Sequence, residues 1–514
     1  MRTYKIFMSF LLTVVVLAGC YDDKGNYDYQ KLTLLTVEIP ETKYTGVSGE
    51  TIKIEPVLTF SDGSTDESRL EFEWSLNGDP ISTERNLAFK VDRILLSAQC
   101  QLRVLDTRTG ITSLAWTTFD LTEKHNVYGW MVLADKDGES LLTYLSQKGS
   151  TIQEYTPYID VFRTENGRAL GTNPVRLLEH FYYGSKTSSF WIVQQGGECV
   201  DLKGDDLKVD IQLSDAFLDP AFGQQLKVKQ IVELRWLTVV VDENGKAYTR
   251  KKEGDGSYHS GKFLNYPLSY QGRELKIDYF IDWRTIKTGF ALMLEGELGS
   301  KRLLAVSGYD KATAGKVMPL TVSSAGYPAN FTAFLDNLGD HEVIYADYFL
   351  TKSPTSTNAH AFGLILKTPV GKYLFQEYKI DDSKGMAVSV TPVRQVEIDI
   401  ASKIDPAGHN IFYFTPYTQN ANFFMSNGRT LYYINRASID SKALIEVKTF
   451  DAEITALDGE SASYGQTLGV GLANGEFYVL DQKNANQVLY QTQTGGGQII
   501  DVRYKIKTAQ GWPR

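Results

Sequence analysis

The residues that could carry out catalysis are abundant in this chain, but none of them falls into a common catalytic arrangement. The six histidines stand singly, and His341-Glu342 lacks the second histidine of a zinc metallopeptidase helix. No Gly-x-Ser-x-Gly nucleophile elbow is present. Asp135, Asp137 and Gly138 mimic the start of a calcium loop, but the glutamate that should close such a loop is absent. The sequence therefore predicts no catalytic residue, no metal site and no cofactor.

Aromatic side chains are the better signal for binding. The chain has 30 Tyr, 25 Phe and 7 Trp. Exposed aromatic faces combined with a few polar groups bind sugars and peptides, because they bury area at small entropic cost. Aromatic residues also pack between strands, so we expect most of them to stabilise the fold and not to contact a ligand. Two clusters combine aromatic residues with glycine or proline, as a ligand-facing loop would: Phe181-Tyr182-Tyr183-Gly184 and Tyr413-Phe414-Thr415-Pro416-Tyr417. From these clusters we predict three ligand contacts, Tyr182, Tyr183 and Tyr417.

Composition limits the class of partner. The 514 residues are 42% hydrophobic and 22% charged, which is ordinary for a globular protein of more than one domain. The formal net charge is -9, and a phosphate backbone would require basic patches, so nucleic acid is not expected as a partner. Cys100 and Cys199 lie in different predicted domains, and we expect both to be buried, unreactive thiols.

A β-sandwich is predicted over residues 31–123. Short alternating runs are separated by turn residues, and the clearest strand is Phe72-Glu73-Trp74-Ser75-Leu76. Its apolar side chains share one face, which places Trp74 in the centre of the sandwich. In a later strand, Cys100, Leu102 and Val104 alternate with polar residues in the same way.

A β-propeller is predicted over residues 124–514. Longer strands are joined by glycine turns ending at Gly138, Gly245, Gly428 and Gly475. Where they are legible, these hairpins recur about every 45 to 60 residues without intervening helices, which is a spacing typical of propeller blades. About seven blades fit this length. A stack of further β-sandwiches is the competing all-β architecture.

Three segments are expected to depart from this pattern. Residues 174–189 and 348–361 read as long loops between strands, and residues 215–225 read as a short helical insert. Acidic residues are frequent, but most occupy turns, and spacing in the sequence cannot reveal two carboxylates that converge in the central channel of a propeller.

The N-terminus resembles a bacterial lipoprotein signal. Arg2 and Lys5 precede an apolar run, and Leu17-Ala18-Gly19-Cys20 follows it. The run is too short to cross a bilayer, so residues 1–19 are predicted to be a signal peptide. The resemblance implies lipidation of Cys20, which would tie the protein to a membrane through the acidic tether of residues 20–30.

The opening of the mature chain, Cys20-Tyr21-Asp22-Asp23-Lys24-Gly25-Asn26-Tyr27, together with the Trp74 strand, resembles the PKD-like family of lipoproteins. This resemblance implies an immunoglobulin-like, PKD-type domain and a lipid-anchored protein of the cell outer membrane that faces the exterior. It also implies an accessory role beside a TonB-dependent transporter and its SusD-like lipoprotein, in a SusC/SusD-type nutrient-uptake system. Only Cys20 maps onto a functional position of that family.

Three functions remain open at this point. The first is a non-enzymatic binding protein that recognises a glycan, a peptide or a partner protein. The second is a propeller enzyme, either a glycoside hydrolase or a polysaccharide lyase, whose acids converge only in three dimensions. The third is a purely structural partner of the transporter complex. Convergent carboxylates in the channel would favour the enzyme, and an exposed apolar patch would favour a protein partner.

Overall fold

The computed structural model describes most of the chain after the first 31 residues. The described residues are 32–149, 152–181, 188–254, 259–281, 289–296, 301–350, 360–382, 387–416, 421–440, 443–460, 466–483 and 487–506. The chain divides into two compact units, Met1–Thr122 and Glu123–Arg514. Among the described residues, no helix is long and apolar enough to cross a membrane.

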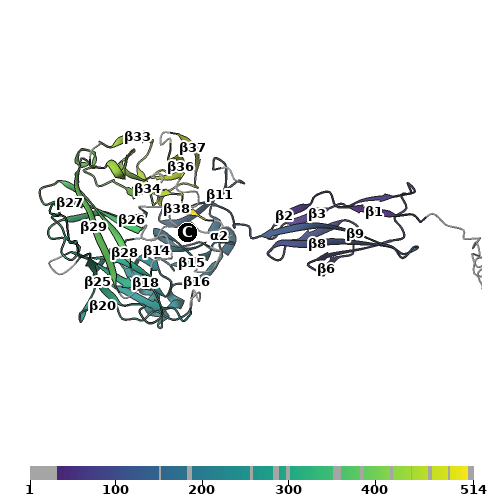
Figure 1. Cartoon of the computed structure of the whole chain (residues 1–514), viewed down its shortest axis with the longest axis horizontal. Helices are drawn as coiled ribbons and strands as arrows, with labels where there is room; N and C mark the ends of the chain where they lie inside the picture. The colour runs from purple at the N-terminus through teal and green to yellow at the C-terminus, as the bar shows by residue number, and fades with distance from the viewer. Residues whose placement is uncertain are drawn as a thin grey trace, which may run out of the picture. The chain divides into compact units, whose positions relative to one another are not determined.

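The first unit is a β-sandwich (Figure 1). One sheet has the order β2-β9-β8-β5-β6, and the pairs β1-β4 and β3-β7 form the opposite layer. Trp74, Leu102 and Phe119 are fully buried in the core between these layers, as the alternating pattern predicts. The strands are β1 (Leu35–Glu38), β2 (Lys43–Val47), β3 (Thr51–Ile54), β4 (Val57–Phe60), β5 (Leu70–Leu76), β6 (Asp79–Ser82), β7 (Leu87–Lys90), β8 (Leu95–Asp106) and β9 (Thr112–Thr122).

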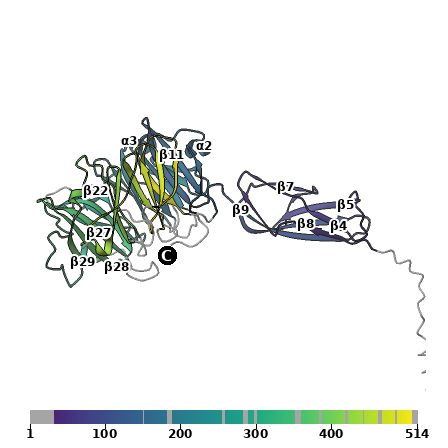
Figure 2. The ribbon, with the colours of Figure 1, turned by 90° about the horizontal axis from the view of Figure 1, so that it is seen from above.

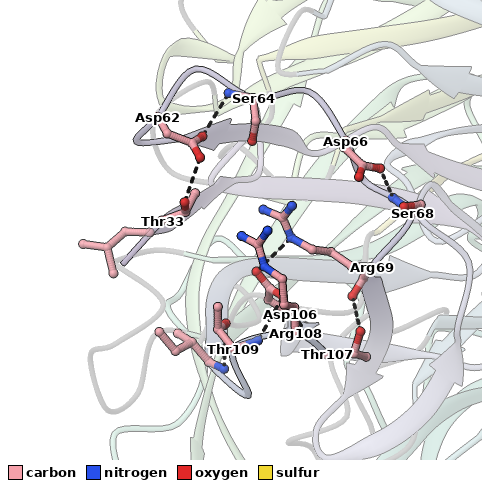
Figure 3. Close-up of polar contacts among 12 residues, drawn as sticks. Thr33, Asp62, Ser64, Asp66, Ser68, Arg69, Asp106, Thr107, Arg108 and Thr109 are labelled. Atoms are coloured by element: carbon pink, nitrogen blue, oxygen red, sulfur yellow. Dashed lines mark hydrogen bonds and ion pairs between the residues drawn. The ribbon is translucent and has the colours of Figure 1, made fainter. Parts of the chain in front are cut away.

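Polar contacts hold the loops at the end of the sandwich where β1 begins (Figure 3). The Asp62 carboxylate accepts hydrogen bonds from the Ser64 amide at 3.0 Å and the Thr33 hydroxyl at 2.7 Å. These bonds lower the pKa of Asp62 to about 2. Arg69 pairs with Asp106 at 3.0 Å and so ties the start of β5 to the end of β8.

The second unit is a β-propeller (Figure 2). Its described strands group into seven blades. In order from the innermost strand, the blades are β38-β10-β11-β12, β13-β14-β15-β16, β17-β18-β19, β22-β23-β24-β25, β26-β27-β28-β29, β30-β31-β32-β33 and β34-β35-β36-β37. Phe263 bridges to Arg250 at the outer edge of the third blade, where a fourth strand would lie. The expected propeller of about seven blades is confirmed, and the stack of sandwiches is not the observed architecture.

The bounds of these elements follow the hairpin pattern of the sequence. The strands are β10 (Gly129–Lys136), β11 (Glu139–Gln147), β12 (Tyr155–Tyr158), β13 (Thr172–Phe181), β14 (Ser188–Gly196), β15 (Val200–Lys203), β16 (Val209–Gln212), β17 (Val228–Glu233), β18 (Leu237–Asp242), β19 (Ala247–Lys251), β20 (Ser269–Tyr270), β21 (Arg273–Glu274), β22 (Ile277–Phe280), β23 (Phe290–Glu295), β24 (Arg302–Ser307), β25 (Val317–Val322), β26 (Glu342–Leu350), β27 (His360–Lys367), β28 (Tyr373–Asp382), β29 (Val388–Ile398), β30 (Phe412–Phe414), β31 (Asn422–Asn427), β32 (Thr430–Asn435), β33 (Ile445–Thr449), β34 (Ile454–Gly459), β35 (Thr467–Leu472), β36 (Glu476–Asp481), β37 (Val488–Gln493) and β38 (Gln498–Lys505). The helices are α2 (Val161–Asn166), α3 (Pro220–Gln225), η1 (Ser214–Ala216), η2 (Ala401–Lys403) and η3 (Arg436–Ser438).

The last strand of the chain closes the ring. β38 pairs antiparallel with β10 and supplies the innermost strand of the first blade. Val502 is fully buried in a core cluster with Trp130 of β10, and the ring of Tyr504 lies edge-on to Trp130 with the ring centroids 5.0 Å apart. The two ends of the propeller sequence are thus joined inside one sheet.

The glycine turns have the geometry that the sequence predicts. Gly138, Gly245, Gly428 and Gly475 all have positive φ and connect β10 to β11, β18 to β19, β31 to β32 and β35 to β36. The helical insert expected at residues 215–225 is present as η1 and α3. Cys100 and Cys199 are buried free thiols, and burial raises the pKa of each to about 12.

The loop predicted over residues 174–189 is wrong. Most of this segment belongs to β13 and β14. Proline cannot donate a hydrogen bond to a sheet, but the β13 ladder is irregular between Pro174 and Arg176, and such irregular positions tolerate proline. The loop predicted over residues 348–361 is wrong at both ends, since β26 extends to Leu350 and β27 begins at His360, and residues 351–359 lie outside the described residues.

Candidate functional site

A cavity lies where the innermost strands of the propeller converge. Its volume is about 380 Å³, within the range of roughly 300–1,000 Å³ typical of small-molecule sites. The lining residues come from β13, β22, β26, β34 and β38 and from β30 with its preceding residue, so six of the seven blades contribute to one wall. This convergence explains why no short motif in the sequence marks the site.

Charged groups of both signs line this cavity. They are Arg176, Asp347, Asp501 and Arg503. An Asp501 oxygen lies 3.4 Å from the Arg503 guanidinium and accepts a hydrogen bond from the Leu177 amide at 2.9 Å. The charges at this position are therefore held inside the wall by an ion pair and by the backbone of the neighbouring blade.

Tyrosines provide most of the remaining polar groups. The hydroxyl of Tyr345 donates to the Asp347 carboxylate at 2.7 Å. Burial, reinforced by the charge of Asp347, raises the pKa of Tyr345 well above its usual value, so this phenol stays a neutral donor. Tyr413 of β30 also lines the cavity.

Tyr279 differs from these tyrosines. It lines the cavity from β22, and its hydroxyl is buried without a hydrogen-bond partner among the described residues. Burial raises the pKa of Tyr279 above its usual value, so the phenol is neutral and can both donate and accept. Most buried polar groups in proteins are hydrogen-bonded. A hydroxyl that has no partner beside a cavity is therefore available to bind a water molecule or a ligand.

The three tyrosines predicted as ligand contacts lie outside the described residues, as does Cys20. Tyr182 and Tyr183 follow β13, and Tyr417 follows β30 by three residues. Both strands contribute to the cavity wall, and Tyr413, which belongs to the same sequence cluster as Tyr417, lines it directly. No sequence motif marks Tyr279, Asp347 or Arg503, because the residues beside each of them form no recognisable pattern.

A second group of buried charges lies between the second and third blades. Asp201 is fully buried and accepts a hydrogen bond from His180 at 2.8 Å. His259 Nε2 lies 3.1 Å from an oxygen of Asp201 and 3.1 Å from an oxygen of Asp210. Burial alone would lower the pKa of His259, but the two carboxylates outweigh it and raise the pKa to about 9.

This buried network continues through Glu233 at the end of β17. The Glu233 carboxylate accepts hydrogen bonds from the Trp191 indole at 2.9 Å and the Thr238 hydroxyl at 2.8 Å. Lys252 Nζ lies 2.9 Å from it, and Arg250 lies 3.6 Å away. No group of His, Cys, Asp or Glu among the described residues is arranged to hold a metal ion. The network joins two blades, and none of its residues named here lines the cavity.

Comparison with protein families supports the assignment of the N-terminal part. A model of the PKD-like family matches residues 20–174, which include the sandwich and the first strands of the propeller. No curated protein matches the chain.

Solved structures similar to this chain are β-propellers of low sequence identity. A quinonprotein alcohol dehydrogenase-like protein from Bacteroides thetaiotaomicron is 14% identical with a TM-score of 0.43, covering 90% of this chain and 96% of its own. A hypothetical selenium-binding protein from Sulfolobus tokodaii is 8% identical with a TM-score of 0.46, covering 75% and 95%. The β-propeller domain of Cps50 (Swd1) from Myceliophteria thermophila is 11% identical with a TM-score of 0.35, covering 64% and 91%. The likeness concerns the fold alone.

Proposed function

We propose that this protein is a lipid-anchored binding protein of the cell outer membrane that holds a small polar ligand in the central cavity of its propeller. Cys20 carries the anchor, and the mature protein faces the exterior. It acts as an accessory of a TonB-dependent nutrient-uptake system, beside a SusC/SusD-like transporter. In the sequence, the sandwich lies between the anchored cysteine and the propeller.

The observation that carries the binding role is the unpaired Tyr279 hydroxyl in the cavity wall. A buried polar group without a partner costs stability of about 1–3 kcal/mol, and a bound ligand removes this cost. Selection for folding alone would favour phenylalanine at such a position. The cavity and this hydroxyl together support a site that receives a polar molecule.

The Tyr279→Phe variant is expected to bind its ligand about five- to tenfold more weakly, since one neutral hydrogen bond contributes roughly 1 kcal/mol. Its thermal stability should be unchanged or slightly higher, because no hydrogen bond within the protein is lost. We would measure binding by calorimetry on protein beginning at Tyr21, against oligosaccharides and peptides. The matched control is Tyr309→Phe, because Tyr309 is exposed and does not line the cavity. Equal affinities in all three proteins would reject the cavity as the ligand site.

The anchor is tested separately from the binding site. The Cys20→Ala variant is expected to leave the membrane fraction and to lose labelling by a palmitate analogue, because the acyl chains provide the membrane affinity. Cys199→Ala, which removes a buried thiol, should remain with the membrane. Protease added to intact cells should degrade the wild-type protein if it faces the exterior. A Cys20→Ala protein that still sediments with membranes would contradict the anchor.

A hydrolytic function is the second candidate, because Asp347 and Asp501 line the same cavity. Glycosidases use two carboxylates on either side of the scissile bond. The calorimetry mixtures should therefore also be analysed for cleavage products. Products from the wild type that disappear in Asp347→Asn would establish the enzyme in place of the binding protein.

A further inference from the structure

We infer that the ligand of the central cavity is an uncharged, hydroxyl-rich molecule of the size of one or two sugar rings. This inference rests on the proposed binding function and specifies its ligand class. It follows from the balance of charge in the cavity wall, from the engagement of each charged group, and from the polar groups that remain available.

The charges of the described lining residues cancel. Two arginines and two aspartates line the cavity, so an anion and a cation each meet as much repulsion as attraction. Transferring a charged ligand from water into such a site costs desolvation free energy. The wall has no excess of opposite charge to offset this cost. A neutral ligand avoids this cost.

The charged groups are also occupied within the protein. The two oxygens of Asp501 accept from the amides of Leu177 and Val502, both at 2.9 Å. Arg503 donates to the carbonyl oxygens of Leu177 at 3.2 Å and Val502 at 3.3 Å, besides lying near Asp501. These contacts offset the charges of Asp501 and Arg503 within the protein, so neither group presents an uncompensated charge to a ligand.

Asp347, on β26, is engaged in the same way. Its two oxygens accept from the Tyr345 hydroxyl and from the Tyr348 amide, both at 2.7 Å. Arg176 also has an interaction partner within the protein. The charged residues therefore fix the shape of the cavity and leave recognition to neutral groups.

The neutral groups suit hydroxyls. Tyr279 can both donate and accept a hydrogen bond, which is the capacity that a sugar hydroxyl complements. Thr455 directs its own hydrogen to the Gly471 carbonyl at 3.3 Å and keeps acceptor capacity. Phe412 and Tyr413 supply apolar ring surface, against which the C–H face of a sugar ring can pack. The volume of about 380 Å³ lies at the small end of ligand sites, which limits the ligand to one or two rings.

The test compares sugars that share a ring but differ in charge. Calorimetry on protein beginning at Tyr21 would use cellobiose, maltose, mannobiose and galactobiose as neutral probes. Digalacturonate and the amino sugar chitobiosamine are the charged probes. We expect at least one neutral disaccharide to bind with a loss of about five- to tenfold in Tyr279→Phe. We also expect galactobiose to bind at least tenfold more tightly than digalacturonate if it is the neutral probe that binds.

A second variant tests the charge balance directly. Asp347→Asn leaves the two arginines facing one aspartate, so it should improve binding of digalacturonate relative to the wild type. No improvement would contradict the role given to charge cancellation. Tight binding of a charged probe or a peptide to the wild type, sensitive to Tyr279→Phe, would overturn the ligand class and leave the binding function standing. Absence of binding by any sugar or peptide would overturn both.

Discussion

A chain that ends after Gly497 is expected to lose the folded propeller and to keep the folded sandwich. The truncation removes β38, whose Ile499, Val502 and Tyr504 are buried in the core of the first blade. Each such side chain contributes roughly 1.5–3 kcal/mol through burial, and the first blade also loses its ladder with β10. The sum is comparable with the whole stability of a typical domain, about 5–15 kcal/mol.

Two point variants on the same strand test this without truncation. Val502→Asp places a carboxylate in a fully buried position and should destabilise the propeller by several kcal/mol. Gln498→Asp changes an exposed position of β38 and should have little effect. Thermal unfolding followed by circular dichroism, with limited proteolysis, would resolve the two units. A Val502→Asp protein that melts as the wild type does would show that β38 is not required to close the ring.

Replacing Asp201 with alanine is expected to destabilise the propeller by about 3–5 kcal/mol. The substitution removes a buried carboxylate that lies 2.8 Å from His180 and 3.1 Å from His259. Asp210→Ala is the matched control, because it removes the more exposed of the two carboxylates and should cost less than about 1 kcal/mol. Chemical unfolding at neutral pH would measure both variants.

The pH dependence of stability gives an independent measurement of the same contact. The pKa of His259 is about 9 in the folded protein and 6.5 in the absence of the fold. A raised pKa means that the folded protein holds the proton more tightly, so this stabilisation is complete below pH 6.5 and disappears as the pH rises through 9. The loss of stability between these values should be smaller in Asp201→Ala. An identical loss in both proteins would assign it to other groups.

Local features of the fold could be predicted from the sequence, and the site could not. The turns at Gly428 and Gly475 are recognisable because a hairpin is specified by a few adjacent residues whose glycine adopts positive φ. Trp74 is similarly placed by the alternation of its own strand. The recurrence of such hairpins then predicts a propeller, which requires no knowledge of how the blades contact each other.

The cavity depends on those contacts. Tyr279 and Arg503 are separated by more than two hundred residues, and they meet because the innermost strands of different blades converge. The innermost strand β13 is also hard to recognise in the sequence, because it carries Pro174 and its ladder is irregular between Pro174 and Arg176. The sequence pattern predicts a loop over this segment, where the structure has a strand.

The pairing of β38 with β10 also sets a time constraint on biosynthesis. β10 begins at Gly129, and its partner begins at Gln498. At about 5–20 residues per second, a ribosome needs roughly 20–70 s to produce the sequence between them. Throughout this interval one edge of β10 lacks its native neighbour and is open to pairing with another chain. The first blade therefore cannot complete its native sheet until β38 has been made.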